Sequence, residues 1–142
     1  MSHKTIAIAA LVTLFVGGSA MAQEHHMMDE STLPEACRTG GEMADSMMPE
    51  MQMPEGMDAA HMALGEGMDR MNADMAMGML PEDIDAAFVC SMIPHHQGAI
   101  DMAKAELEHG DDPWVREMAQ KVITAQEQEI KDMIAWLEKQ AQ

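Results

Sequence analysis

Apolar and polar residues alternate with a helical period from Asp58 onward. In the first segment of this kind, apolar or imidazole side chains follow one another at spacings of three and four residues, as in a heptad seam on one helix face: His61, Leu64, Met68, Met71 and Met75. Gly78 interrupts the pattern. We therefore predict one helix from about residue 58 to residue 78.

A second helical segment opens at Pro81, which is followed by two acidic residues near the positive end of the helix dipole, and continues to about His109. At about 100° per residue, His95 and His96 share its apolar face, so both imidazoles are predicted to point inward. The other residues predicted on this face are Ile84, Phe88, Val89, Met92, Ala99, Met102, Ala103 and Leu107.

A third segment begins after Gly110, with Asp111 or Asp112 as the predicted cap and Pro113 at the first helical position, and continues to about Lys139. Short loops between the three helices favour antiparallel packing. The predicted buried stripe of the third helix is Val115, Met118, Val122, Met133 and Leu137.

No strand pattern accompanies these helices, so residues 58–142 are predicted to form an all-α antiparallel helical bundle. Three helices of this size enclose only a small core. We expect the bundle to be completed either by a short helix from the N-terminal segment or by a second copy, giving a monomer or a homodimer.

The N-terminal part of the chain differs from the helical part. Residues 1–22 have a lysine, a short apolar run and an A-x-A exit, which is typical of a cleavable secretory signal peptide. Residues 23–57 are rich in methionine, glycine and proline without a helical or strand period, and we predict a flexible segment. No later stretch approaches the roughly 20 apolar residues of a membrane helix. The expected location is the periplasm, without membrane insertion.

The formal net charge of −17 becomes −18 when the leader and its one lysine are removed. Such acidity makes nucleic acid and anionic membranes poor partners and favours cations. Cys37 and Cys90 are the two cysteines of the chain. In an oxidising compartment they are expected to form a disulfide, with a thiolate pair for a soft metal as the alternative.

Methionine is unusually abundant, with 20 residues in the chain and 14 of them between Met27 and Met79. Methionine on a helix is ordinarily flexible core filler. Here it is equally dense in the predicted flexible segment, where there is no core to fill. Thioether sulfur selects Cu(I) and, by the same softness, Ag(I), whereas imidazole accepts copper in either oxidation state. The composition therefore favours a soft-metal protein.

Sulfur and nitrogen ligands occur together on the second predicted helix. Met92, His95 and Met102 are separated by three and seven residues, and His96 follows Met92 by four, so one helix face offers both donor types. Pro94 donates no helical hydrogen bond, and a local bend is expected there. The heptad seam adds candidate ligands on the first predicted helix, namely His61, Met68, Met71 and Met75.

A different metal site is predicted at the mature N-terminus. Cleavage after residue 22 would leave a chain that begins with Gln23 and has His25 in third position. A terminal amine, two amides and this imidazole form a square-planar nitrogen set that suits Cu(II). The residues that follow, His26, Met27 and Met28, could take the metal after reduction.

The segment from Phe88 to Gln140, with "MIPHHQGAIDMA" followed by an "HG.DP.VR" run, resembles the exported CopM-like family. This resemblance implies a ferritin-like antiparallel four-helix bundle that binds Cu(I) or Ag(I) in periplasmic copper resistance, with other periplasmic copper proteins as candidate partners. The residues that match the His and Met positions of the motif are Met92, His95, His96, Met102, His109, Met118 and Met133.

The leading hypothesis is a periplasmic copper-binding protein, not an enzyme, that sequesters or shuttles the metal. One alternative is a ferritin-like di-iron carboxylate protein. Glu106 and His109 form one E-x-x-H pair, but we find no second pair, which such a centre needs. The other alternative is an interaction protein whose methionine surfaces bind partners without metal.

Overall fold

The structure is a computed structural model that describes residues 31–38 and 52–140. It contains a short 3-10 helix, η1 (Glu35–Cys37), and four α-helices: α1 (Ala59–Gly65), α2 (Met68–Gly78), α3 (Ile84–His109) and α4 (Pro113–Gln140). The described residues contain no strand. The predicted all-α fold is therefore confirmed. None of the described helices is long and apolar enough to cross a bilayer.

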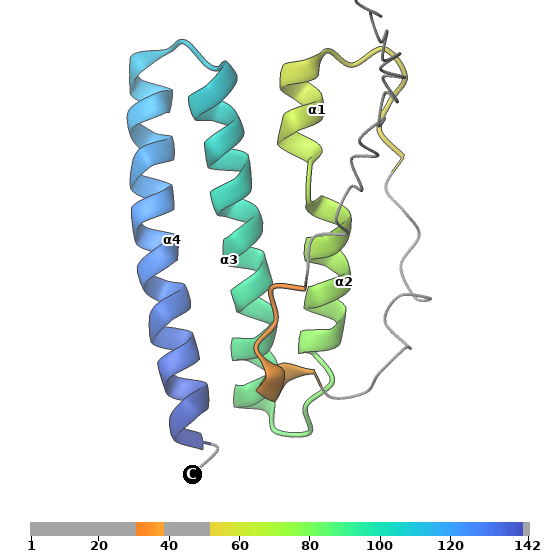
Figure 1. Ribbon diagram of the computed structural model, residues 1–142, viewed down its shortest axis with the longest axis vertical. Helices are drawn as coiled ribbons and strands as arrows, with labels where there is room; N and C mark the ends of the chain where they lie inside the picture. The colour runs from red at the N-terminus through yellow and green to blue at the C-terminus, as the bar shows by residue number, and fades with distance from the viewer. Residues whose placement is uncertain (1–30, 39–51, 141–142) are drawn as a thin grey trace, which may run out of the picture.

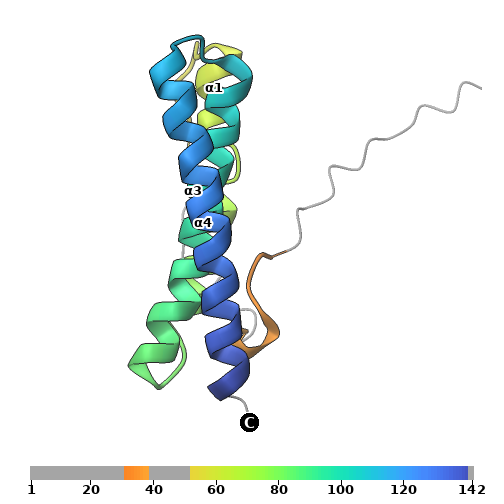
Figure 2. The ribbon, with the colours of Figure 1, turned by 90° about the vertical axis from the view of Figure 1, so that its left-hand side faces the viewer.

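The helices lie side by side in a single layer, with α3 in the middle (Figures 1 and 2). Helix α4 runs along one side of α3, and α1 and α2 follow one another along the other side. Within the described part of the chain, α3 packs on each of its neighbours, whereas α4 has no comparable packing on α1 or α2. A closed four-helix arrangement is not present in these residues.

The first predicted helix is broken in two, which corrects the expectation of one continuous helix over residues 58–78. Glu66 has an extended backbone, and Gly67 adopts φ = 82°, a left-handed conformation that glycine tolerates best. Asp58 caps α1 by accepting a hydrogen bond from the His61 amide at 3.0 Å. The seam residues before and after the break therefore do not share one straight helix.

Aspartate caps determine where the two long helices begin. The Asp83 carboxylate accepts from the Ala86 amide at 2.9 Å, so α3 begins at Ile84 and not, as predicted, at Pro81. The Asp112 carboxylate accepts from the Trp114 amide at 2.9 Å, and α4 begins at Pro113 as predicted.

Pro94 lies inside α3 without ending it. The residue is buried, and the helix continues past it to His109. Proline removes one helical hydrogen bond and crowds the preceding turn. Packing of α3 against both of its neighbours outweighs this cost.

The N-terminal segment forms part of the core. Cys37 and Cys90 are joined by a disulfide, with their Cα atoms 5.5 Å apart. The expectation of a flexible segment over residues 23–57 does not hold for residues 31–38, because Leu33 and Cys37 are buried against the long helices. The buried cluster consists of Leu33, Cys37, Cys90, Ile93 and Leu137.

A buried carboxylate also holds this segment. Asp74 of α2 is only 2% exposed, and it accepts hydrogen bonds from the Ser31 hydroxyl at 2.7 Å and from the amide and hydroxyl of Thr32, both at 2.9 Å. Three donors thus compensate for the removal of this carboxylate from water. No sequence pattern indicates this contact, because Ser31 and Asp74 are separated by 43 positions in the chain.

Several residues predicted in the core lie on the surface instead. On α3, Ile84, Phe88 and Met102 are exposed, and on α4 Met118 is exposed. Because α3 has neighbours on two sides of one layer, mostly compact side chains are buried between the helices and larger ones extend from the open face. The buried residues of α3 are Ala87, Cys90, Ile93, Pro94, His96, Ile100, Ala103 and Ala105.

Candidate metal centre

A methionine side chain of α2 lies against the middle of α3. A Cβ atom at Gly98 would overlap Sδ of Met71 and would lie 3.1 Å from its Cγ. Glycine at position 98 therefore makes room for the thioether. Met71 is half-buried, and its sulfur lies between α2 and α3.

Two of the predicted ligands flank this sulfur. His95 precedes Gly98 by three residues and Met102 follows it by four, so both lie on the same face of α3, about one turn from Gly98 on either side. Both side chains are exposed. The inward orientation predicted for His95 is therefore wrong. Two methionines and one histidine therefore lie within about one helical turn of Gly98.

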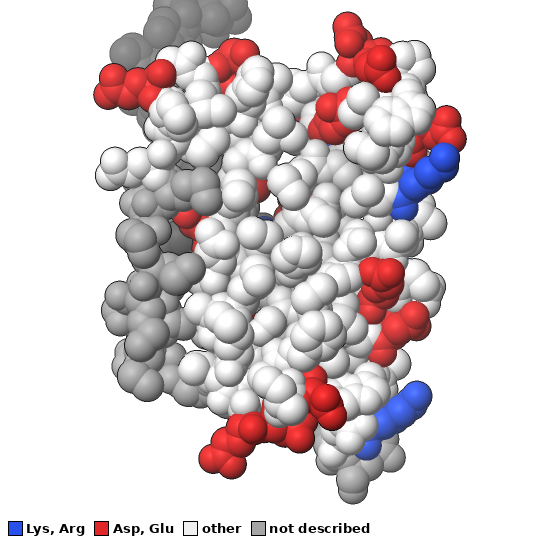
Figure 3. Space-filling model, turned by 180° about the vertical axis from the view of Figure 1, so that it is seen from behind, with Lys and Arg blue, Asp and Glu red and all other residues white. Residues whose placement is uncertain are grey.

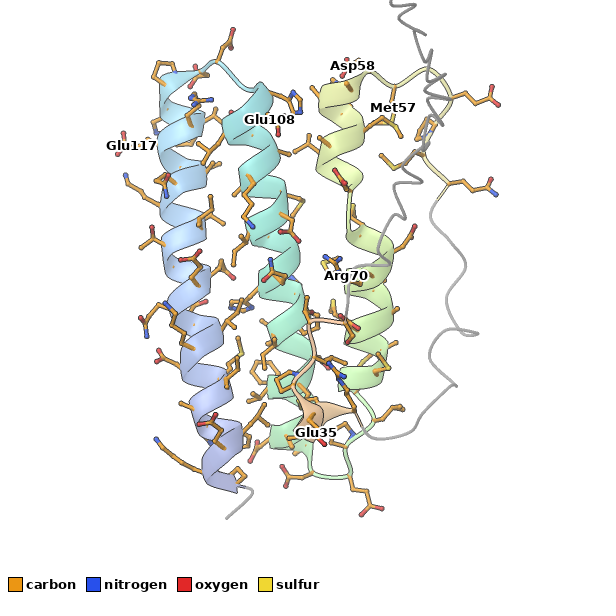
Figure 4. All side chains as sticks on the ribbon, in the orientation of Figure 1. Glu35, Met57, Asp58, Arg70, Glu108 and Glu117 are labelled. Carbon is orange, nitrogen blue, oxygen red and sulfur yellow. A yellow bond between two sulfur atoms is a disulfide. The ribbon has the colours of Figure 1, made fainter. Side chains whose placement is uncertain are left out.

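Charged side chains also lie between α2 and α3. Arg70 of α2 extends toward α3 (Figure 4) and approaches the Asp101 carboxylate at 3.7 Å. The same carboxylate accepts a hydrogen bond from Gln97 at 3.0 Å. Asp101 follows Gly98 by three residues, and Lys104 also pairs with its carboxylate, at 3.5 Å, so two cations balance this half-buried charge.

His96 is buried, as predicted, but both its ring nitrogens have partners. Nδ1 lies 2.7 Å from the carbonyl oxygen of Met92, and Nε2 lies 2.6 Å from Oε2 of Glu129 on α4. A carbonyl and a carboxylate are both acceptors, so the N–H of either ring tautomer meets an acceptor here. A metal at Nε2 would have to displace Glu129. In this arrangement His96 links α3 to α4. The His96 ring also lies edge-on to the His95 ring, at a centroid distance of 5.8 Å.

A second pair of predicted ligands meets where α1 begins and α3 ends. His61 and His109 line one pocket of about 180 Å³, together with Glu106. His61 Nδ1 lies 2.8 Å from Oδ1 of Asp58, and Figure 4 shows Asp58 at this end of the molecule. A carboxylate that orients an imidazole in this way is common beside bound metals.

These contacts change the pKa of the Asp58 carboxyl group. The hydrogen bond from the His61 backbone amide, and then the one from the His61 ring, lower the pKa of Asp58 below its usual value. Asp58 is exposed to solvent, so its influence is local. It caps α1 and orients the His61 ring at the pocket.

Two predicted ligands on α4 lie away from both the Met71 contact at Gly98 and the pocket lined by His61 and His109. Met133 lines a different pocket, of about 420 Å³, beside Phe88 and Trp136. Met118 is exposed in the first half of α4. The structure therefore does not bring these two methionines to the Met71 side chain at Gly98.

The other candidates are distributed along α2 or lie outside the described part of the chain. Met68 and Met75 are half-buried on α2, and the main-chain carbonyl of Met75 accepts from the Ser91 hydroxyl at 3.4 Å. The four candidates of the mature N-terminus lie outside the described residues: His25, His26, Met27 and Met28.

Within residues 31–38 and 52–140, no three His, Cys, Asp or Glu side chains are placed to hold one metal ion together. These residues therefore give no support to a carboxylate-rich di-iron centre. Methionine is not among those donor types, so the finding does not bear on a thioether site. Cys37 and Cys90 bond to each other, and the described part of the chain has no free thiol.

Gly98 and Glu129 were not identified from the sequence as residues of the candidate metal centre. Gly98 lies inside a helical pattern, and a glycine there is a recognisable sign of close approach by a neighbouring group. Glu129 carries no comparable sign, because its partner His96 is 33 residues away.

The chain is similar to a known domain family over most of its length. Residues 18–137 match the family model described as "Domain of unknown function (DUF305)". No curated protein matches the chain. Because the match spans far more than half of the sequence, the chain belongs to this family of unknown function.

Proposed function

We propose that this protein binds Cu(I), with Ag(I) as a second soft ion, and sequesters or shuttles it in the periplasm. The observation that carries the proposal is the placement of the Met71 side chain at Gly98, with His95 and Met102 about one turn away on either side. Two thioethers and an imidazole are donors that a soft monovalent copper ion prefers.

The simpler explanation is that Met71 only fills space between α2 and α3. Methionine packs irregular gaps well, and Met71 does occupy such a gap. Packing within one chain does not account for the exposed His95 and Met102 beside it, because neither is buried among the described residues. It also leaves unexplained the 14 methionines between Met27 and Met79. A metal site explains why exposed sulfur and imidazole side chains occur together next to Gly98.

The net charge supports a cation as the ligand. A formal charge of −17 attracts positive ions to the surface, and thioether ligands contribute no charge of their own. The Asp101 carboxylate does not add to this attraction, because Arg70 at 3.7 Å and Lys104 at 3.5 Å balance its charge. The resemblance to the CopM-like family, with its role in periplasmic copper resistance, and the signal-peptide pattern of residues 1–22 agree with this proposal.

The test is an anaerobic Cu(I) titration in competition with a chromophoric chelator. The double variant Met71→Leu and Met102→Leu keeps apolar side chains of similar size, which a fold tolerates with little loss of stability. We expect it to bind the tightest equivalent of Cu(I) at least about tenfold more weakly, a difference of about 1.4 kcal/mol. His95→Gln is expected to have a similar effect.

The matched control is the pair Met62→Leu and Met79→Leu. Both methionines are exposed, at 46% and 62%, and neither lies at Gly98. This variant should retain the affinity of the unaltered protein. Equal Cu(I) affinities for the two double variants, with unchanged helical circular dichroism, would contradict the assignment of the site.

A further inference from the structure

The face of the helical layer opposite η1 is broad and largely uncharged in its middle. Figure 3 views the molecule from this side, and its charged residues gather at the two ends and along the edge. In a protein with 25 acidic residues, such a region is unusual. Depletion of charge at the centre of an exposed face is characteristic of a protein interface.

Large apolar side chains of α3 form a stripe on this side. Ile84 and Phe88 are 78% and 63% exposed, and Met102 follows Phe88 by two heptads. Successive members of the stripe are separated by three or four residues, as in a coiled-coil seam that requires a facing helix. The stripe consists of Ile84, Phe88, Met92, His95, Ala99 and Met102.

Helix α4 has a parallel stripe on the same side. Trp136 lines one pocket together with Phe88, so its side chain lies beside the α3 stripe. Five helical turns, at about 3.6 residues per turn, separate Met118 from Trp136, so the two side chains point in the same direction. Met118 is 45% exposed, and Trp114, one turn earlier, is 69% exposed. The antiparallel pair α3 and α4 therefore presents two adjacent apolar stripes.

A single layer of helices leaves such stripes in water, and stable folds bury them under a second layer. On the opposite face, residues 31–38 of the same chain supply part of that cover. We propose that the face formed by the stripes of α3 and α4 binds a second copy of this chain, so that the α3 and α4 pairs of two copies form a four-helix arrangement.

The size of the face fits this partner. Helices α3 and α4 contain 26 and 28 residues, so each is roughly 40 Å long, and two adjacent helices are about 20 Å wide. The face therefore covers about 800 Å², the area that each partner contributes to a stable interface of standard size. A two-fold axis near the middle of α3 pairs the Ile84 end of one stripe with the Met102 end of the other, which makes the seam self-complementary.

The charge of the chain predicts how this association depends on salt. Both copies carry a strongly negative charge, with carboxylates at the ends of the face. Their repulsion is screened as ionic strength rises. The dimer is therefore expected to become tighter with salt, whereas binding of a basic partner to the same face would become weaker.

The experiment is sedimentation velocity of the purified protein with its disulfide intact, in the presence of a metal chelator, over a wide concentration range. The chelator separates this association from the proposed copper binding. We expect a concentration-dependent dimer that tightens with salt. Phe88→Glu should weaken it at least about tenfold, because it removes an aromatic anchor and places a charge on the apolar stripe. Met79→Glu, at a methionine that is 62% exposed in the turn before α3, should leave it unchanged.

Three outcomes would overturn the inference. One is a protein that stays monomeric up to millimolar concentration. Another is equal dimerisation of the Phe88→Glu and Met79→Glu variants at unchanged helical circular dichroism, because the interface would then lie elsewhere. The third is protection of Trp114 from a soluble fluorescence quencher at every concentration, because another segment of the same chain would then cover the face.

Discussion

Asp74 offers the sharpest test of how the N-terminal segment is held. Its carboxylate is buried and accepts three hydrogen bonds, one from the Ser31 hydroxyl at 2.7 Å and two from Thr32 at 2.9 Å. Asp74→Ala removes all three acceptor contacts at once and leaves the Thr32 amide without its partner. We expect this variant to be strongly destabilised.

The expected loss in the free energy of unfolding is worked out from the three hydrogen bonds. A hydrogen bond to a charged group contributes about 1.5–3 kcal/mol to stability. The two hydroxyls can turn toward water after the substitution, so the loss is less than the sum of three bonds, and we expect about 3 kcal/mol. A domain of this size has a free energy of unfolding of roughly 5–15 kcal/mol. The corresponding decrease in Tm is about 12–24 °C.

The measurement is denaturant unfolding followed by far-ultraviolet circular dichroism. Asp74→Asn keeps the size of the side chain and one carbonyl oxygen for Thr32, while its amide can donate to Ser31, so the expected loss is only about 1 kcal/mol. The exposed Glu127→Ala on α4 should change stability by less than about 0.5 kcal/mol. A value for Asp74→Ala within that same range would refute the reasoning.

Three further predictions concern other parts of the molecule. Gly98→Ala should change stability by no more than about 1 kcal/mol, since the gain in helix propensity offsets the displacement of the flexible Met71 side chain. It should nevertheless weaken Cu(I) binding about tenfold in the chelator competition, and unchanged binding would argue against a site next to Gly98. Reduction of the Cys37–Cys90 disulfide, which spans 53 residues, should lower the free energy of unfolding by about 4 kcal/mol. The check is a decrease in Tm with reductant, and an unchanged Tm would show that the link does not stabilise the fold. The depressed pKa of Asp58 means that its cap stabilises α1 above the ordinary aspartate pKa and is lost as pH falls through the lower folded value. In an NMR titration its carboxyl carbon should have a midpoint below 3.8, and a midpoint at or above that value would contradict the capping geometry.

Local sequence signals determined the approximate limits of the long helices. Asp83 and Asp112 cap α3 and α4 with their carboxylates, and both act on backbone amides two or three residues away. Such contacts depend only on the nearest neighbours in the chain. The helical class of the domain, the approximate ends of its long helices and the abundance of soft sulfur donors could therefore be predicted without a structure.

The break between α1 and α2 is harder to predict from local signals. The residues on both sides fit one heptad pattern, and only Gly65 and Gly67 indicate an interruption. The positive φ of Gly67 occurs at the link between α1 and α2, which follow one another along the same side of α3. A period in the sequence shows which residues could share a face, but it does not show that the helix is continuous.

The faces of the helices were decided by the tertiary structure. The periodicity of α3 predicts one apolar side that includes Phe88, His95 and Met102, whereas the structure places these residues on the exposed side. Helix α3 is covered on two flanks by α2 and α4, so compact residues such as Ala87 and Cys90 are buried there. The number and position of a helix's neighbours, which no single segment encodes, determine which side loses contact with water.

At the candidate site, too, the sequence determined some features and the tertiary structure determined others. The sequence by itself determined the donor types, because a methionine or histidine has the same ligand chemistry wherever it lies. Only the tertiary structure brought Met71 of one helix to Gly98 of another and paired His96 with Glu129 across 33 residues. Contacts between distant segments depend on how whole helices pack, since packing fixes distances that local propensities leave open.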